Sequence, residues 1–123
     1  MAKKVKIRWR TEPEDNNYPA AESYLSLLYD EQTTGKLVKR LERAPLSEFK
    51  AKDIFRASGL SLLGISNSHV ERDRKKILDG RKLSPLLLVR DGRNGRVVIA
   101  DGYHRLCSVY VFDEDALIPC KIV

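Results

Sequence analysis

Several features are scarce or absent in this chain of 123 residues, which has two cysteines, one tryptophan, three phenylalanines and no long apolar run. Two cysteines cannot build a disulfide scaffold or an all-cysteine zinc site, so Cys107 and Cys120 are expected to be free thiols. A run of roughly 20 apolar residues, which would cross a bilayer, is missing. The basic start of the chain also lacks the apolar segment of a secretory signal. These absences predict a cytoplasmic protein with no membrane partner.

The composition that remains is typical of a globular, basic domain. Hydrophobic residues make up 42% of the sequence and charged residues 33%, a balance that favours one folded domain over disorder. The net charge of +6 is compatible with a nucleotide, DNA or another polyanion as partner. Basic residues gather at 3–10, 36–43, 72–82 and 90–96. Solvated surface faces and a continuous basic groove both explain such clusters, but the aromatic interleaving of single-strand binders is absent.

The hydrophobic pattern predicts a mixed α+β fold in a single domain over residues 1–123. We divide it into an N-terminal strand and loop (1–17), a helical subregion (18–65) and a core (66–123). Helices are expected from 18 to 28 and from 36 to 43, with a break at Thr33, Thr34 and Gly35. Residues 46–52 are ambiguous. Other helices are predicted at 53–58, 69–78 and 103–111, and strands at 5–10, 86–89, 97–100 and 118–123.

The segment that carries the most chemistry is the predicted turn from a buried strand into a helix at Gly102. The first backbone N–H groups of a helix have no intrahelical acceptor, and the helix dipole adds partial positive charge there. Such a turn binds anions, and His104 and Arg105 on the first helical turn can donate to phosphate oxygens. Asp101 can cap the helix, hold Arg105, contact a magnesium ion or accept a substrate proton. The segment therefore predicts a phosphate site beside a carboxylate.

A purely structural interpretation of the same residues stays open. Asp-Gly is a common turn before a helix, His104 can be a partly buried donor, and Arg105 can simply pair with Asp101. A metal cage made by protein side chains alone is not expected. The four candidate ligands, two histidines and two cysteines, include only one short pair, His104 and Cys107.

Five elements follow one another in the second half of the chain. They are a charged helix ending in Gly80, an apolar strand led by Pro85, a second apolar strand at 97–100, the turn Asp101-Gly102-Tyr103-His104-Arg105, and Ile118-Pro119. This order resembles the core of the ParB/sulfiredoxin superfamily over a little under half of the chain. The resemblance implies a small mixed sheet with surrounding helices. The N-terminal helices have no counterpart in it.

The resemblance implies that Gly102, the backbone of Tyr103, His104 and Arg105 bind nucleotide phosphates, of CTP as in partition proteins or of ATP as in sulfiredoxins. Tyr103 stands where sulfiredoxins place their catalytic cysteine, so sulfinic acid reduction is not expected. Partition proteins carry a DNA-reading domain after this core, and a complete partition protein is not expected from these 123 residues. Its Asp-Gly-x-His-Arg sequence is similar to that of free-serine kinases. This similarity implies that Asp101 is a catalytic carboxylate in magnesium-dependent phosphoryl transfer or nucleotide hydrolysis.

In the superfamily, the helix before the Pro-led strand helps to enclose the phosphates. By that comparison, the secondary pocket candidates are Ser68, His69, Lys75, Lys82 and Ser84, although each is more simply explained as an exposed surface residue. Two other functions stay open. One is a DNA-associated or nuclease-like module that uses Lys75, Lys76 and Arg81. The other is a regulatory or interaction domain with a vestigial anion site, and an oligomer is compatible with all three.

Overall fold

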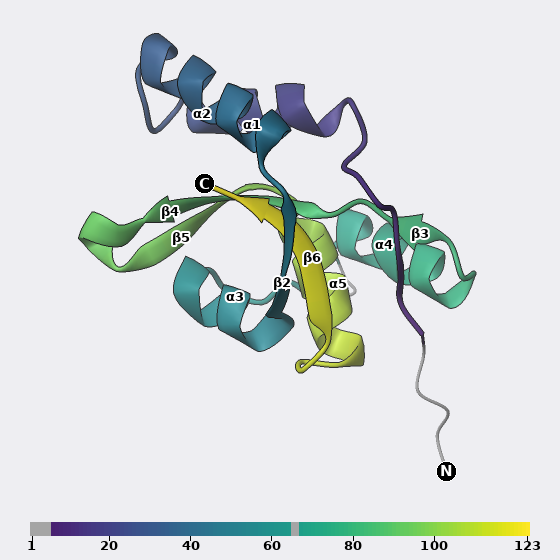
Figure 1. The fold of residues 1–123 in the computed structure, drawn as a ribbon. Helices are drawn as coiled ribbons and strands as arrows, with labels where there is room; N and C mark the ends of the chain where they lie inside the picture. The colour runs from purple at the N-terminus through teal and green to yellow at the C-terminus, as the bar shows by residue number, and fades with distance from the viewer. Residues whose placement is uncertain (1–5, 65–66) are drawn as a thin grey trace.

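The computed structural model describes residues 6–64 and 67–123, and within these ranges the α+β prediction is confirmed. Helices and strands alternate irregularly along the chain, and a 3-10 turn, Gly92–Asn94, closes the β4–β5 hairpin (Figure 1). In chain order the elements are β1 Arg8–Trp9, α1 Asn17–Leu25, α2 Glu31–Arg43, β2 Leu46–Lys50, α3 Ala51–Ser58, α4 Ser68–Leu78, β3 Lys82–Leu83, β4 Leu86–Asp91, β5 Arg96–Asp101, α5 Tyr103–Phe112 and β6 Leu117–Ile122. The predicted strand at 5–10 is reduced to β1, and Val5 lies outside the described residues.

A four-stranded mixed sheet with the order β2-β6-β4-β5 organises the fold. Strand β4 pairs antiparallel with β5 and parallel with β6, while β2 pairs antiparallel with β6. The ambiguous stretch 46–52 is therefore extended over β2, and the segment 18–65 supplies one edge of the sheet. Strands β1 and β3 form a separate parallel pair.

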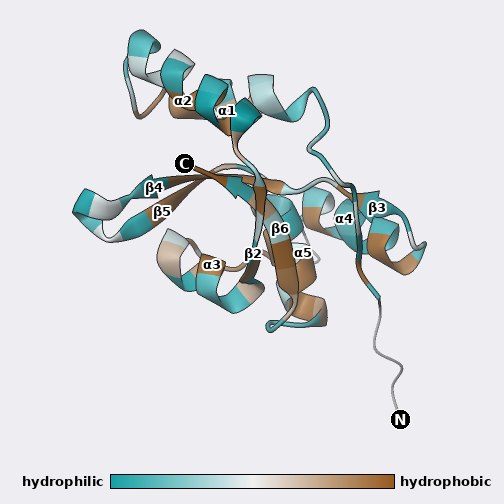
Figure 2. Cartoon of the chain, in the orientation of Figure 1, coloured by the Kyte–Doolittle hydropathy of each residue, from teal (hydrophilic) through white to brown (hydrophobic). Residues whose placement is uncertain are grey.

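Strand β4 is apolar along most of its length because both of its faces are covered. Leu86 and Leu88 belong to a core cluster on the side of α3 and α5, while Leu87 and Val89 pack with α1 and α2 on the other side. Figure 1 shows these two helical layers on opposite sides of the sheet. Figure 2 shows the apolar character of β6 between them and the hydrophilic outer surface of α2.

The break predicted at Thr33, Thr34 and Gly35 is wrong, because these residues lie inside α2. The helix starts earlier since the Asp30 side chain accepts a hydrogen bond of 2.7 Å from the Thr33 N–H, which caps its first turn. Thr34 is buried, so tertiary packing also holds this turn in the helix. The chain instead leaves the helical path at Ser26, after the shorter α1.

Two attachments position the elements that surround the predicted phosphate site. Helix α5 packs against α4, where the buried Ser108 hydroxyl donates to the Val70 carbonyl at 2.9 Å. The Glu14 N–H donates to Ser84 Oγ at 3.0 Å and to Asn17 Oδ1 at 3.1 Å, which fastens the N-terminal loop to the segment before β4. The Ser84 hydroxyl in turn donates to Asn17 Oδ1.

Among the described residues, no helix is both long enough and apolar enough to cross a membrane. Cys107 and Cys120 are buried free thiols, as predicted. Burial raises the pKa of Cys120 to about 12, so its thiol stays protonated at neutral pH.

Candidate functional site

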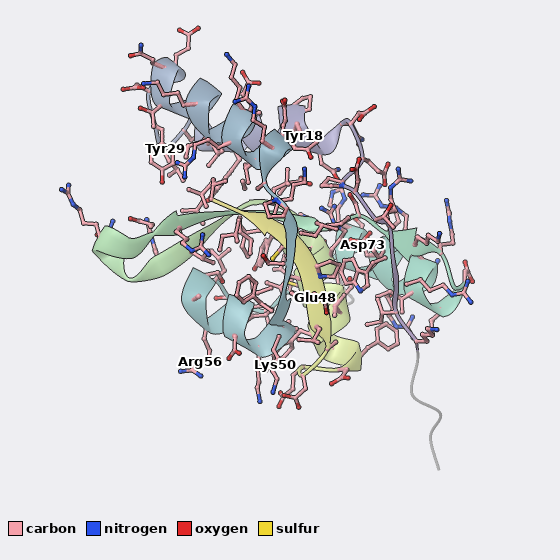
Figure 3. The ribbon with its side chains drawn as sticks, in the orientation of Figure 1. Tyr18, Tyr29, Glu48, Lys50, Arg56 and Asp73 are labelled. Atoms are coloured by element: carbon pink, nitrogen blue, oxygen red, sulfur yellow. The ribbon has the colours of Figure 1, made fainter. Side chains whose placement is uncertain are left out.

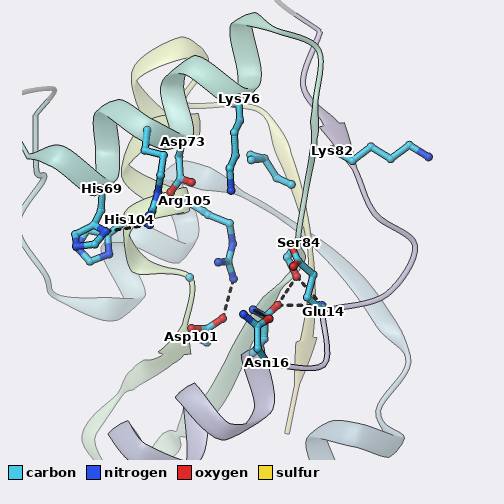
Figure 4. A pocket seen from close by; sticks show the side chains of 14 residues that line it. Glu14, Asn16, His69, Asp73, Lys76, Lys82, Ser84, Asp101, His104 and Arg105 are labelled. Carbon is cyan, nitrogen blue, oxygen red and sulfur yellow. Dashed lines mark hydrogen bonds and ion pairs between the residues drawn. The ribbon is translucent and has the colours of Figure 1, made fainter.

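A cavity of about 390 Å³ lies beside the turn from β5 into α5 (Figure 4). Its walls come from the N-terminal loop, α4, the β3–β4 segment, the end of β5 and the first turn of α5. The lining residues are Glu14, Asn16, Asn17, His69, Arg72, Asp73, Lys76, Lys82, Leu83, Ser84, Asp101, Gly102, His104 and Arg105. Four of these side chains are Lys or Arg and three are Asp or Glu, so the lining carries a net charge of +1 with both histidines neutral.

Most residues predicted for the site meet at this cavity. Asp101, Gly102, His104 and Arg105 line it together with the secondary candidates His69, Lys82 and Ser84. Figure 4 shows the Lys82 side chain extending away from the cavity. The structure does not bring Ser68, Lys75 or Tyr103 into the lining. The Tyr103 hydroxyl donates instead to the Ser61 carbonyl.

Gly102 forms the elbow between β5 and α5, and its geometry accommodates only glycine. Its φ of +110° lies in the left-handed region that side chains rarely adopt. A Cβ at this position would lie 2.7 Å from Leu86 Cγ and 2.9 Å from Arg105 Nη2. The missing side chain therefore provides both the turn and the space for the Arg105 guanidinium.

The N-terminus of α5 lies beside the cavity and leaves its first amides unpaired among the described residues. No side chain among the described residues caps this helix, and its first backbone hydrogen bond runs from the Leu106 N–H to the Gly102 carbonyl at 2.9 Å. Within residues 6–64 and 67–123, the N–H groups of Tyr103, His104 and Arg105 have no acceptor. These donors and the positive end of the helix dipole favour an anion.

The Arg105 guanidinium contacts both the Asp101 side chain and the backbone before β4. Its Nη2 donates to Asp101 Oδ2 at 2.9 Å, and the two side chains are only 16% and 18% exposed. The same nitrogen lies 3.4 Å from the Pro85 carbonyl. Its Nε is buried with no partner among the described residues, an orphan donor that costs free energy unless a ligand or water satisfies it.

The two histidines stand side by side at one end of the cavity. The ring centroids of His69 and His104 are 4.8 Å apart, and Arg72 Nη2 lies 3.0 Å from His69 Nδ1. Burial lowers the pKa of His104, and the charges of His69, Arg72 and Arg105 lower it further against the opposing effect of Asp73. His104 is therefore neutral at physiological pH and offers one N–H to a ligand.

The lowered pKa of His104 predicts how stability changes with pH. The unfolded state takes up this proton near pH 6.5, whereas the folded state resists protonation, so acid favours unfolding. We expect the free energy of unfolding of the wild type, relative to His104→Gln, to fall as pH drops from about 7.5 to about 5.5. Urea denaturation of both proteins across this range measures the difference, and a constant difference would contradict the assignment.

Sequence reasoning predicted His69 of α4 but missed the other side chains that α4 and the N-terminal loop contribute. Arg72, Asp73 and Lys76 share one face of α4 with His69, at the i, i+3, i+4 and i+7 spacing of a helix. That spacing is present in the sequence, but the resemblance assigned Ser68, His69 and Lys75 of this helix to the pocket rather than the face that His69 shares with Arg72, Asp73 and Lys76. The loop residues Glu14 and Asn16 carry no comparable signal, since they meet α4 only in the folded chain.

Asp73 is the least solvated of these side chains, at 6% exposure. Within the part of the chain that the structure describes, it makes no hydrogen bond and no ion pair. Burial raises its pKa, and the charges of Arg105, Lys76, Arg72 and His104 act in the opposite direction. Figure 3 shows Asp73 among the side chains below the N-terminal loop, whereas Arg56 projects into solvent.

Comparisons with protein-family models, with curated proteins and with solved structures found no match for the chain. A functional assignment therefore rests on the residues of the cavity and their geometry.

Proposed function

We propose that the cavity binds the phosphate groups of a nucleoside triphosphate, ATP or CTP, in a ParB/sulfiredoxin-like domain of the cytoplasm. The observation that carries this proposal is that His104 and Arg105 line one cavity wall at the N-terminus of α5, where the first amides of the helix are unpaired among the described residues. Backbone amides and a guanidinium complement phosphate oxygens better than they complement any uncharged ligand. Lys76 and Arg72 line the same cavity from α4, and their positive charges contribute to the net charge of +1 on its lining.

The bound nucleotide would be placed for hydrolysis or phosphoryl transfer. Asp101 uses Oδ2 to orient Arg105, and its Oδ1 has no partner among the described residues. This free oxygen lies beside the first turn of α5, where the phosphates would bind. In this proposal Asp101 holds the phosphate-binding arginine in place and offers its second oxygen to the ligand.

Magnesium is the ion expected with a nucleoside triphosphate, and it typically binds through one or two carboxylates together with substrate phosphates. Among the described residues, no group of three or more potential ligands could hold a metal on protein side chains alone. The single free oxygen of Asp101 fits a magnesium ion that is held mainly by the nucleotide. When bound, the ion would neutralise phosphate charge.

Nucleotide binding predicts a thermal shift of the intact protein. ATP or CTP at about 100 times its Kd stabilises the folded state by about 2.7 kcal/mol, so the melting temperature rises. We expect a saturable rise with the triphosphate and magnesium, and a smaller one with inorganic phosphate. A panel of nucleotides with and without magnesium, monitored by differential scanning fluorimetry, measures it.

The absence of any shift at millimolar nucleotide would overturn the proposal. A shift produced equally by every polyanion, including duplex DNA, and lost steeply with added salt would point instead to the DNA-associated alternative. The basic residues of α4 already divide between two environments, since Arg72 and Lys76 line the cavity while Arg74 pairs with Glu71 at 3.3 Å. Because the basic side chains of α4 do not all point to one surface, this arrangement favours a small ligand in the cavity over DNA that lies along one face of the helix.

A further inference from the structure

We infer that Asp73, rather than Asp101, accepts the proton of the hydroxyl group that attacks the bound nucleotide. This inference rests on the proposed function and assigns one step within the same cavity. In that step the hydroxyl oxygen of water or of an alcohol forms a bond to the γ-phosphorus. The bond from that phosphorus to the β–γ bridging oxygen breaks, and its electron pair leaves on the nucleoside diphosphate. The hydroxyl proton moves to the Asp73 carboxylate.

The carboxylates of Asp101 and Asp73 differ in their hydrogen-bond and ion-pair partners. Asp101 is engaged with Arg105 at 2.9 Å, so one of its two oxygens already holds the guanidinium in place. Asp73 is 6% exposed, lines the cavity and has no hydrogen-bond or ion-pair partner within residues 6–64 and 67–123. A buried carboxylate that accepts no hydrogen bond and forms no ion pair loses no such interaction when it takes up a proton.

The position of Asp73 also suits the transfer. Figure 4 shows it on α4 across the cavity from Asp101, beside Arg105 and near His104. The charged and titratable groups that act on it are Arg105 and His104 from α5 and Arg72 and Lys76 from α4. A phosphate bound by these cations would cancel part of their effect on Asp73. The pKa of Asp73, which burial already raises, would then move further toward neutral pH, where a general base works best.

The test separates binding from turnover with the variant Asp73→Asn, which keeps the shape of the side chain and removes its proton acceptor. We expect nucleoside diphosphate formation from magnesium ATP or CTP to fall by about 10²- to 10⁴-fold, as is typical for the loss of a general base. Nucleotide affinity, measured by calorimetry, should be unchanged or higher because a negative charge leaves the cavity. Phosphorus NMR distinguishes water, which yields free phosphate, from an alcohol such as glycerol, which yields a phosphomonoester.

The matched control is Asp79→Asn, which makes the same change at the exposed C-terminal end of α4 and should keep wild-type binding and turnover. The rate of the wild type should fall in acid at a higher pH than the ordinary carboxyl value of 3.8, and this fall should vanish in Asp73→Asn. Wild-type turnover in Asp73→Asn would overturn the inference, as would equal losses of binding and turnover. So would a wild-type protein that binds nucleotide but forms no diphosphate, although nucleotide binding would then stand.

Discussion

Replacing Gly102 with alanine is expected to destabilise the fold and to disrupt the cavity at the same time. The alanine would have to adopt a φ of +110° and would place its Cβ 2.7 Å from Leu86 Cγ. Backbone strain of this kind costs about 1 to 3 kcal/mol, and overpacking against a buried leucine costs a similar amount. We expect a loss of about 2 to 6 kcal/mol in the free energy of unfolding, measured by urea denaturation.

The matched control is Gly59→Ala at the C-terminal end of α3. Gly59 also has a positive φ of +68°, but a Cβ there would meet nothing within 4 Å. Alanine at this position is expected to cost only about 1 kcal/mol, because strain acts without a clash. If Gly102→Ala were no more destabilising than Gly59→Ala, the close approach of Leu86 and Arg105 to the elbow would be refuted.

The second large effect is expected from Arg105. Removing a charge-assisted donor to phosphate typically costs about 1.5 to 3 kcal/mol, so Arg105→Ala should weaken nucleotide binding by about 10- to 150-fold. Arg105→Lys retains the charge but cannot reproduce the planar fork that reaches Asp101 and a phosphate together. Its affinity is therefore expected to fall between those of the wild type and the alanine variant. Isothermal titration with magnesium ATP and CTP measures all three.

Two controls isolate the role of Arg105 from its charge and from folding. Arg93→Ala removes the same charge from the exposed hairpin turn and should leave affinity unchanged. The single variant Arg105→Ala would leave the Asp101 carboxylate half-buried and without its partner, which can itself destabilise the fold. The double variant Arg105→Ala/Asp101→Asn removes that unpaired charge. Wild-type affinity in either Arg105 variant, with Arg93→Ala as the reference, would contradict the assignment of the anion site.

Local sequence signals predicted the second half of the chain well. The apolar runs that became β4 and β5 and the glycine at the head of α5 each specify their structure over a few residues. Gly59, which follows α3 with a φ of +68°, is likewise the residue type that a left-handed helix cap favours. The start of helix α2 was harder to predict, because it depends on one side-chain cap at Asp30 and on the burial of Thr34.

The candidate site could be predicted only where its residues are neighbours in sequence. Asp101, Gly102, His104 and Arg105 belong to one turn, so their meeting follows from the turn itself. Asp73 reaches them only because α4 packs on α5, and no local pattern encodes that packing. Its loss of hydration is likewise a property of the assembled fold, since the adjacent Arg72 is exposed.

The double hydrogen bond of the Glu14 amide has a consequence for how the cavity is assembled. Its acceptor on Ser84 is 70 positions away along the chain, so this wall closes only after distant parts of the polypeptide have met. A contact of such high sequence separation on an otherwise irregular loop is the kind that opens in sub-global fluctuations while the sheet stays intact. Hydrogen–deuterium exchange at this one amide would therefore report how often this cavity wall opens, separately from global unfolding.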